Sequence, residues 1–391
     1  MKKRVMIVSN TLAEGGAERW ASFMVSGLDR DAFDVSLVLF RDQRTYPCPK
    51  DVSIHCVEHD RFPQALRTVR RLRRLIRHEK IDIVISNGNY TAPFVGQAIR
   101  GTDAPWIARF SGSFQHCQSS LKEQLSFRWL DQNIAYARTL VANSRGLAND
   151  VSDRWPSLKH QIAVIRNGID LEIVPTTTML ADASEVPLVV AAGRLTKQKR
   201  PGLFVSAVKQ QAERSSDEKS PSFRAVWCGD GPLRREVESQ ISQVDLKDHV
   251  ELLGFRSDFH DLLAKASCFV LCSDHEGSPN VLAEAMTLGV PVIATDCPHG
   301  PSELIGTNRG WLVPTNDPDK LADAIGECLS NRKEAHARAT RAKDWADAEL
   351  DQQELIKSWS QLIMGDGSSD YHGKTVDGET VRSSDLHAEV V

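Results

Sequence analysis

The sequence contains 391 residues, of which 41% are hydrophobic and 26% charged, and its formal net charge is −4. This length suits two domains, the composition is that of an ordinary soluble protein, and the small negative charge gives no reason to expect nucleic-acid binding. No apolar run approaches the roughly 20 residues that a membrane-spanning helix needs. The sequence therefore predicts a cytoplasmic protein without a signal peptide, and its eight cysteines, which form no C-x-x-C pair, are predicted to be reduced and mostly buried.

The first half of the chain alternates apolar strands with helices. Residues 4–9 form a continuous apolar run, and a glycine turn at Glu14–Arg19 joins it to a helix over residues 20–28. Further buried strands are predicted at 35–40, 81–86, 106–110 and 140–143. This alternation is typical of a parallel α/β sheet.

The same alternation returns in the second half, with strands predicted at 186–192, 224–228, 250–253, 268–271 and 291–294. We infer two doubly wound domains, 1–174 and 175–342, because a polar stretch at 174–185 breaks the periodicity. Residues 343–364 predict an amphipathic terminal helix, and residues 365–391 hold few large apolar side chains and are predicted to be disordered. A ligand is expected between the domains, at the carboxyl ends of the strands.

One stretch of the second domain predicts an anion site. The strand at 268–272 is followed by a polar loop, in which Ser278 and Pro279 suit the N-cap and the first position of a helix. The backbone N–H groups of Asn280, Val281 and Leu282 would then face the loop. Together with the helix dipole they favour an anion such as a diphosphate.

Two glutamates flank this predicted anion site. Glu276 lies in the loop and Glu284 one to two turns inside the helix, so both can meet hydroxyl groups beside the anion. In isolation they would be ordinary surface acids. However, the pattern E-G-x-P-N-x-x-x-E-A-M-x-x-G-x-P-V-I-A-T resembles the donor-site signature of glycosyltransferase family 4. The resemblance implies a GT-B fold, which is an α/β fold of two facing Rossmann-like domains with a C-terminal crossover helix at 343–364 that returns to the first domain.

The resemblance also implies roles for these residues and for a basic loop after the strand at 186–192. Glu284 would hold the ribose hydroxyls and Glu276 the transferred sugar. The loop matches the family's G-R-L-x-x-x-K element from Gly193 onward, so Arg194 and Lys199 would neutralise the diphosphate as it leaves. A solvated basic turn is the alternative. Where the family usually has Lys-Gly this chain has Lys199-Arg200, which leaves Lys197 or Arg200 as possible substitutes for Lys199.

Several glycine elements extend the resemblance. Gly229 lies in a G-x-G-P-x element, and Gly254 with Phe255 matches the L-G-F turn that borders the nucleobase pocket in the family. Gly15 and Gly16 resemble the family's glycine loop near the donor phosphates. They lack the G-x-G-x-x-G spacing of a dinucleotide site, which argues against a dehydrogenase.

The acceptor side departs from the family pattern. Family members commonly carry a histidine after the strand that corresponds to 106–110, near the acceptor hydroxyl. This chain instead has Ser111 directly after the strand and His116 further along the loop. Either Ser111 replaces the usual residue or His116 reaches in from the loop.

The stretch from Arg67 to Arg77 is the most basic part of the chain. Leu66, Val69, Leu72 and Ile76 share one helical face, which leaves six arginines around the rest of the helix. The stretch is either a solvated helix packed on the sheet or a site of electrostatic attachment to anionic lipid.

The resemblance implies a retaining enzyme that moves a hexose or N-acetylhexosamine from a nucleoside diphosphate sugar, for which we expect a UDP-sugar, to a glycan or lipid-linked acceptor. We expect no cofactor and no metal, because the D-x-D arrangements at 29–31 and 317–319 do not follow an apolar strand. The enzyme would act in the cytoplasm or at the cytoplasmic face of a membrane. The alternatives are a sugar-nucleotide 2-epimerase or hydrolase on the same fold, and a non-catalytic membrane-associated sugar-nucleotide binding protein.

Overall fold

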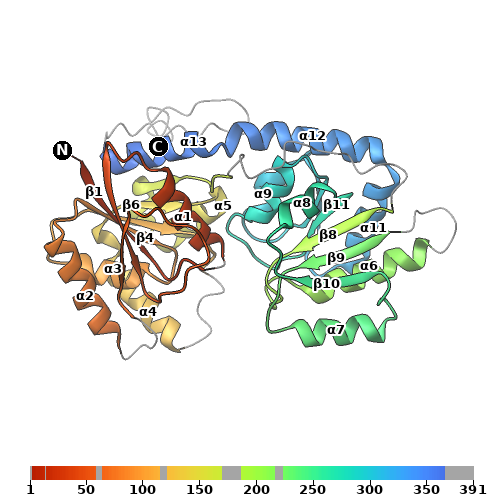
Figure 1. The fold of residues 1–391 in the computed structure, drawn as a ribbon, viewed down its shortest axis with the longest axis horizontal. Helices are drawn as coiled ribbons and strands as arrows, with labels where there is room; N and C mark the ends of the chain where they lie inside the picture. Colours follow the sequence, from red (N-terminus) through yellow and green to blue (C-terminus); the bar gives the residue numbers. More distant parts are fainter. Residues whose placement is uncertain are drawn as a thin grey trace, which may run out of the picture. The chain divides into compact units, whose positions relative to one another are not determined.

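The structure is a computed structural model that describes residues 2–13, 15–58, 64–114, 121–169, 186–215 and 223–365. The chain divides into two units (Figure 1). The first unit is Met1–Gly168 together with Gln353–Val391, and the second is Ile169–Gln352. The predicted linker at 174–185, the predicted tail beyond Gly365 and the candidate residue His116 lie outside the described residues.

The first unit is built on a parallel sheet in the order β3-β2-β1-β4-β5-β6-β7. The order reverses between β1 and β4, which is a topological switch point of a doubly wound fold. The strands are β1 (Lys3–Ser9), β2 (Phe33–Leu39), β3 (Ser53–Cys56), β4 (Ile83–Asn87), β5 (Trp106–Phe110), β6 (Ala137–Ala142) and β7 (Ile162–Val164).

Helices cover both faces of this sheet. One face carries α2 (Ala65–His78), α3 (Ala92–Ile99), α4 (Leu121–Asn133) and α5 (Arg145–Arg154), and the other carries α1 (Gly16–Gly27) and α13 (Gln352–Met364). The 3-10 helices η2 (Ile134–Tyr136) and η3 (Pro156–Gln161) complete the unit. Because successive strand residues point to opposite faces, Met6 and Val8 pack under α2 and α3, whereas Val5 and Ile7 pack under α1.

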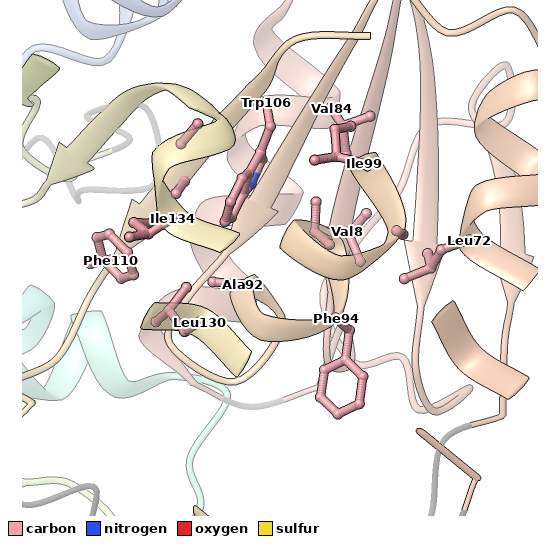
Figure 2. Packing of buried hydrophobic residues seen from close by; sticks show 14 of the residues in the cluster. Val8, Leu72, Val84, Ala92, Phe94, Ile99, Trp106, Phe110, Leu130 and Ile134 are labelled. Atoms are coloured by element: carbon pink, nitrogen blue, oxygen red, sulfur yellow. The ribbon is translucent and has the colours of Figure 1, made fainter. Parts of the chain in front are cut away.

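The core under α2, α3 and α4 is closely filled (Figure 2). Trp106 lies fully buried on β5, and its indole N–H donates to Ser86 Oγ at 2.9 Å. Phe94 of α3 and Leu72 of α2 pack in the same cluster. Burial of this apolar surface on both faces explains why the strands read as continuous apolar runs.

The second unit has a smaller parallel sheet in the order β10-β9-β8-β11-β12-β13, which again reverses at its centre, between β8 and β11. One face packs against α6, α7 and α11, and the other against α8, α9, α10 and α12. The strands are β8 (Leu188–Ala192), β9 (Arg224–Cys228), β10 (Val250–Gly254), β11 (Cys268–Leu271), β12 (Val292–Thr295) and β13 (Trp311–Val313). The helices are α6 (Pro201–Ser215), α7 (Arg234–Gln243), α8 (Phe259–Ala264), α9 (Asn280–Thr287), α10 (Pro301–Ile305), α11 (Pro318–Ser330) and α12 (Arg332–Glu349).

The terminal helix predicted at 343–364 is two helices in the structure, α12 and α13. The break falls at Leu350 and Asp351, where the backbone N–H of Ile169 donates to the Leu350 carbonyl at 3.1 Å. Beyond the break, Trp359 packs in the core of the first unit, with its ring centroid 4.9 Å from that of Trp20. The predicted return of the chain onto the first unit is therefore confirmed. The returning segment consists of two helices rather than the one helix that was predicted.

The strands predicted from the sequence are present with shifts of a few residues at their ends. Three strands were not predicted, β3, β7 and β13, and each is a short edge strand of three or four residues. The first helix begins at Gly16 rather than Trp20, because the glycine turn closes directly into it. The cysteines of the described ranges are free thiols, and Cys228, Cys268, Cys272, Cys297 and Cys328 are buried, as predicted.

Candidate functional site

Most of the motifs predicted to bind the donor converge on one edge of the second sheet. Gly193 follows β8 directly, Gly229 follows β9 and Gly254 ends β10. Ser273 lies just beyond β11 and leads into the loop that carries Glu276. Because the carboxyl ends of parallel strands meet at the same edge, motifs some 80 residues apart along the chain come together here.

A close backbone contact requires glycine at position 229 of this edge. Gly229 has φ of 128°, and its N–H donates to the Gly254 carbonyl at 2.7 Å. A Cβ on Gly229 would lie 2.3 Å from the Gly193 carbonyl oxygen, which no side chain can tolerate. The Trp227 indole N–H donates to the same oxygen at 2.9 Å. The loops after β8, β9 and β10 are thus fixed against one another.

Helix α9 provides the predicted helix N-terminus, one residue later than expected. Pro279 is the N-cap, with φ −73° and ψ 106°, and the first helical residue is Asn280. The prediction of Ser278 as N-cap is wrong, because the extended Pro279 lies outside the helix. The Leu282 N–H donates to the Pro279 carbonyl at 3.1 Å. Of the three predicted anion-binding groups, the N–H of Leu282 is therefore already hydrogen-bonded within the protein.

Lys199 and Glu276 form the central charged contact of the site. Lys199 Nζ lies 2.5 Å from Glu276 Oε1, and Ser273 Oγ donates to the same oxygen at 2.5 Å. Glu276 is 8% exposed and Ser273 fully buried. The sequence assigned Lys199 and Glu276 to different parts of a donor and did not predict that they touch.

Backbone and side-chain contacts hold the two loops of this charged pair together. Gln198 Nε2 donates to the His275 carbonyl at 2.8 Å, and the Asp274 N–H donates to the Gln198 carbonyl at 2.8 Å. Arg200, considered above as a substitute for Lys199, pairs with Asp274 at 3.4 Å and also bonds Asn316. The site therefore places Lys199, and not Arg200, beside Glu276.

Arg194, which follows Gly193 at this edge, is exposed. Its side chain makes no ion pair or hydrogen bond with the residues that the structure describes, in contrast to Lys199 and Arg200. A guanidinium in this position can bind an anion from outside with both of its N–H edges.

Glu284 is almost completely buried, with 2% of its surface exposed. Its Oε2 lies 3.1 Å from Nε2 of His260, a residue of α8 that is about one fifth exposed. No motif in the sequence marked His260.

Phe255, the residue expected to border the nucleobase, follows β10 directly and is 64% exposed.

The residues predicted in the first unit also lie after its strands. Gly15, with φ of 152°, is the N-cap of α1, and Gly16 is the first residue of that helix. A Cβ on Gly15 would lie 2.3 Å from Glu18 Oε2. Ser111 follows β5 and lies close to Gly88, which follows β4. A Cβ added to Gly88 would lie 3.5 Å from Ser111 Oγ.

The aspartates of the two D-x-D arrangements have local structural roles. Asp317 Oδ1 caps α11 by accepting from the Lys320 N–H at 3.0 Å, and Asp29 Oδ1 accepts from the Asp31 N–H at 2.9 Å.

Among the described residues, no helix is long and apolar enough to cross a membrane.

Two family models match the chain. The model described as Glycosyltransferase Family 4 matches residues 14–173, and the model described as Glycosyl transferases group 1 matches residues 180–345. Together they span most of both units. The two doubly wound sheets and the donor-site motifs define a glycosyltransferase with the GT-B fold. The chain belongs to glycosyltransferase family 4 and is an enzyme of the hexosyltransferase class.

Individual proteins support this assignment. An N-acetylgalactosamine-N,N'-diacetylbacillosaminyl-diphospho-undecaprenol 4-alpha-N-acetylgalactosaminyltransferase of Campylobacter jejuni is 24% identical over 367 residues, which cover 91% of this chain and 98% of that protein. A UDP-Gal:alpha-D-GlcNAc-diphosphoundecaprenol alpha-1,3-galactosyltransferase of Escherichia coli is 27% identical over 66% of this chain and 69% of its own length. The solved structure of Anabaena Alr3699/HepE in complex with UDP and glucose has a TM-score of 0.76 at 19% identity, covering 92% of this chain and 99% of that one.

Proposed function

We propose that this protein is a retaining glycosyltransferase that moves a hexose or N-acetylhexosamine from a UDP-sugar to a hydroxyl group of a lipid-linked or glycan acceptor, in the synthesis of a cell-surface polysaccharide or glycolipid. The observation that carries the proposal is the grouping of Arg194, Lys199, Glu276 and the N-terminus of α9 at one edge of the second sheet. The C. jejuni and E. coli relatives are named for diphospho-undecaprenol acceptors, and the E. coli relative also for a UDP-sugar. These names support the choice of donor and acceptor.

The proposed chemistry depends on charge that grows on the leaving diphosphate. Groups that bind this charge more strongly in the transition state than in the ground state accelerate the reaction. Arg194 is exposed and able to fork onto phosphate oxygens. Lys199 and the backbone N–H groups at the start of α9 add positive potential from the protein side.

Glu276 is proposed to bind the transferred sugar. Both of its contacts among the described residues, from Lys199 and from Ser273, fall on Oε1. Oε2 therefore keeps its acceptor capacity for a sugar hydroxyl. The same two contacts stabilise the carboxylate charge and lower its nucleophilicity, which favours front-face attack, with a donor phosphate oxygen taking the acceptor proton, over a covalent glycosyl-enzyme.

The basic helix α2 is proposed to bring the enzyme to a membrane surface that carries the acceptor. Arg67, Arg70, Arg74 and Arg77 are exposed. Leu66, which the sequence grouped with the apolar face of this helix, is not buried with that face but is 57% exposed. An apolar side chain beside several cations suits an anionic lipid surface. The enzyme would then act at the cytoplasmic face of the membrane.

Product analysis tests the proposal. The purified protein is incubated with radiolabelled UDP-sugars and a membrane extract or a synthetic lipid-linked saccharide, and the labelled products are separated. Transfer of label to lipid with the anomeric configuration kept is the expected result. Epimerised or hydrolysed donor would assign a different reaction to this fold, and unchanged donor with every UDP-sugar would oppose an enzymatic role.

Glu276→Gln is the matched control for this assay. The variant keeps the size of the side chain but removes the charge that holds Lys199, so label transfer should fall sharply. If the wild type and the variant transfer label equally, the activity does not belong to this site.

A further inference from the structure

The buried carboxylate of Glu284 and the imidazole of His260 form a contact that the proposed function leaves unexplained. Glu284 lies in the second turn of α9, and His260 lies in α8, the helix that precedes β11. Their side chains meet at 3.1 Å, between His260 Nε2 and Glu284 Oε2. The contact joins two helices on the same face of the second sheet.

When Glu284 is ionised its carboxylate only accepts hydrogen bonds, and Nε2–H of His260 is then the donor in this contact. The two oxygens of a carboxylate offer about four lone-pair directions, so a carboxylate that is held by a histidine can also accept hydrogen bonds from hydroxyl groups.

A glutamate side chain has three rotatable bonds, and an ordered carboxylate binds a ligand better than one that must be ordered on binding. We propose that His260 is a positioning residue that fixes the carboxylate of Glu284 in the orientation that accepts hydrogen bonds from the ribose hydroxyls of the donor nucleotide. This inference rests on the proposed function, in which Glu284 holds the ribose. It assigns to α8, which carries none of the recognised motifs, a part in nucleotide recognition.

The position of His260 suits this role better than a purely structural one. Its side chain is about one fifth exposed, so it is not a core residue that the fold needs for packing. The other charged groups of its helix and of the preceding loop are Asp261, Lys265 and an ion pair of Arg256 with Asp258. The contact to Glu284 joins α8 to α9, the helix that begins at the predicted anion site.

Binding of nucleotides with and without ribose hydroxyls tests the inference. Affinities of full-length wild type, His260→Leu and His260→Gln for UDP and for 2′,3′-dideoxy-UDP are measured by calorimetry. His260→Leu removes this hydrogen bond and should weaken UDP binding about tenfold to 100-fold, the effect of one lost hydrogen bond to a charged group. Binding of the dideoxy nucleotide should change less than about twofold, since it has no hydroxyl for Glu284 to accept.

His260→Gln is the conservative variant, because its amide N–H₂ can replace Nε2–H, and it should restore UDP affinity to within about threefold of wild type. In a double-mutant cycle, His260→Leu should add little to Glu284→Gln, since both changes remove the same recognition. In kinetic assays His260→Leu should raise KM for the donor with little change in kcat, because ribose contacts are equal in the ground and transition states.

Two results overturn the inference alone. One is equal weakening of UDP and dideoxy-UDP binding by His260→Leu, which would make the residue merely structural. The other is unchanged UDP affinity in His260→Leu while Glu284→Gln loses affinity. If wild type itself does not discriminate between UDP and the dideoxy nucleotide, both this inference and the proposed role of Glu284 fail.

Discussion

Each of the two sheets has an arginine near the carboxyl ends of its strands, and the two arginines differ in burial and in contacts. At the edge of the second sheet, Arg194 is exposed and makes no ion pair with the described residues. At the edge of the first sheet, Arg109 is fully buried at the end of β5. Its guanidinium donates to Asn87 Oδ1 at 2.7 Å and to Asn167 Oδ1 at 2.8 Å, and it lies 4.3 Å from the ring centroid of Trp20.

This difference separates a cation that can bind a ligand from one that holds the fold. Burial lowers the pKa of Arg109 to about 9, with the carboxylate of Glu18 partly opposing this effect, so the side chain is still charged at neutral pH. Two amide oxygens and an aromatic face stabilise its charge, whereas its Nε–H has no hydrogen-bond partner among the described residues. One of those oxygens belongs to Asn167, close to the point where the chain leaves the first unit. We expect Arg109 to govern stability and Arg194 to govern catalysis.

The largest effect is expected from the charged pair of the second unit. Lys199→Ala removes a cation next to the proposed diphosphate site and leaves the carboxylate of Glu276 with only the hydroxyl of Ser273. We expect kcat/KM to fall about 100- to 1,000-fold, which is the usual cost of losing one preorganised group that stabilises developing charge. Initial rates with the preferred UDP-sugar measure the effect.

Lys197→Ala is the matched control for Lys199→Ala, because Lys197 is an exposed cation of the same loop. It should keep activity within about threefold of wild type. Equal losses in the two variants would reduce the role of Lys199 to the general positive potential of the loop.

The next effect concerns the stability of the first unit. Arg109→Ala removes the guanidinium that donates to two buried amide oxygens and opens a cavity, so we expect a loss of about 2–4 kcal/mol in the free energy of unfolding. Since Arg109 is protonated in both the folded and the unfolded state below about pH 8, the loss should be the same at pH 6 and pH 8. Urea denaturation at the two pH values measures it.

Arg109→Met sharpens this test, because it keeps most of the volume and removes only the charge and its donors. An intermediate loss is expected. If the methionine variant is more stable than wild type, the desolvation of the buried charge destabilises the fold by more than its hydrogen bonds stabilise it.

The sequence predicted the fold well and placed the candidate donor motifs at the ends of strands, because both depend on local patterns. Continuous apolar strands, glycine turns and the Pro279 helix start each have a short-range signal. The contacts between Lys199 and Glu276 and between His260 and Glu284 have no such signal. They depend on which loops and helices meet across the sheet, which only the packing decides. The short edge strands escaped prediction for a related reason, since three or four residues are too few to show a period.

A smaller catalytic effect is expected at Arg194. Arg194→Ala should lower kcat about 10- to 100-fold and weaken UDP binding less, since the charge that it binds is greatest in the transition state. Single-turnover rates and calorimetry with UDP separate the two effects. Arg194→Lys keeps the charge but loses the forked geometry and should recover only part of the rate. Should UDP affinity fall as much as kcat, Arg194 would bind ground and transition states alike.

The smallest effect is expected for single arginines on α2, and the structure divides these into two kinds. Arg70 is exposed and its side chain makes no hydrogen bond or ion pair with the described residues, whereas Arg73 Nη2 donates to the Gln97 carbonyl at 2.7 Å and its Nε to the Ala98 carbonyl at 3.1 Å. If α2 binds anionic lipid, Arg70→Gln should weaken co-sedimentation with phosphatidylserine-containing vesicles by about 1 kcal/mol, or about fivefold, and Arg73→Gln should weaken it less. The difference should shrink as salt is raised from about 0.05 M to 0.5 M, because screening shortens the reach of exposed charges. Equal binding of wild type and Arg70→Gln at low salt, or equal binding to neutral vesicles, would make α2 a solvated helix that only covers the sheet.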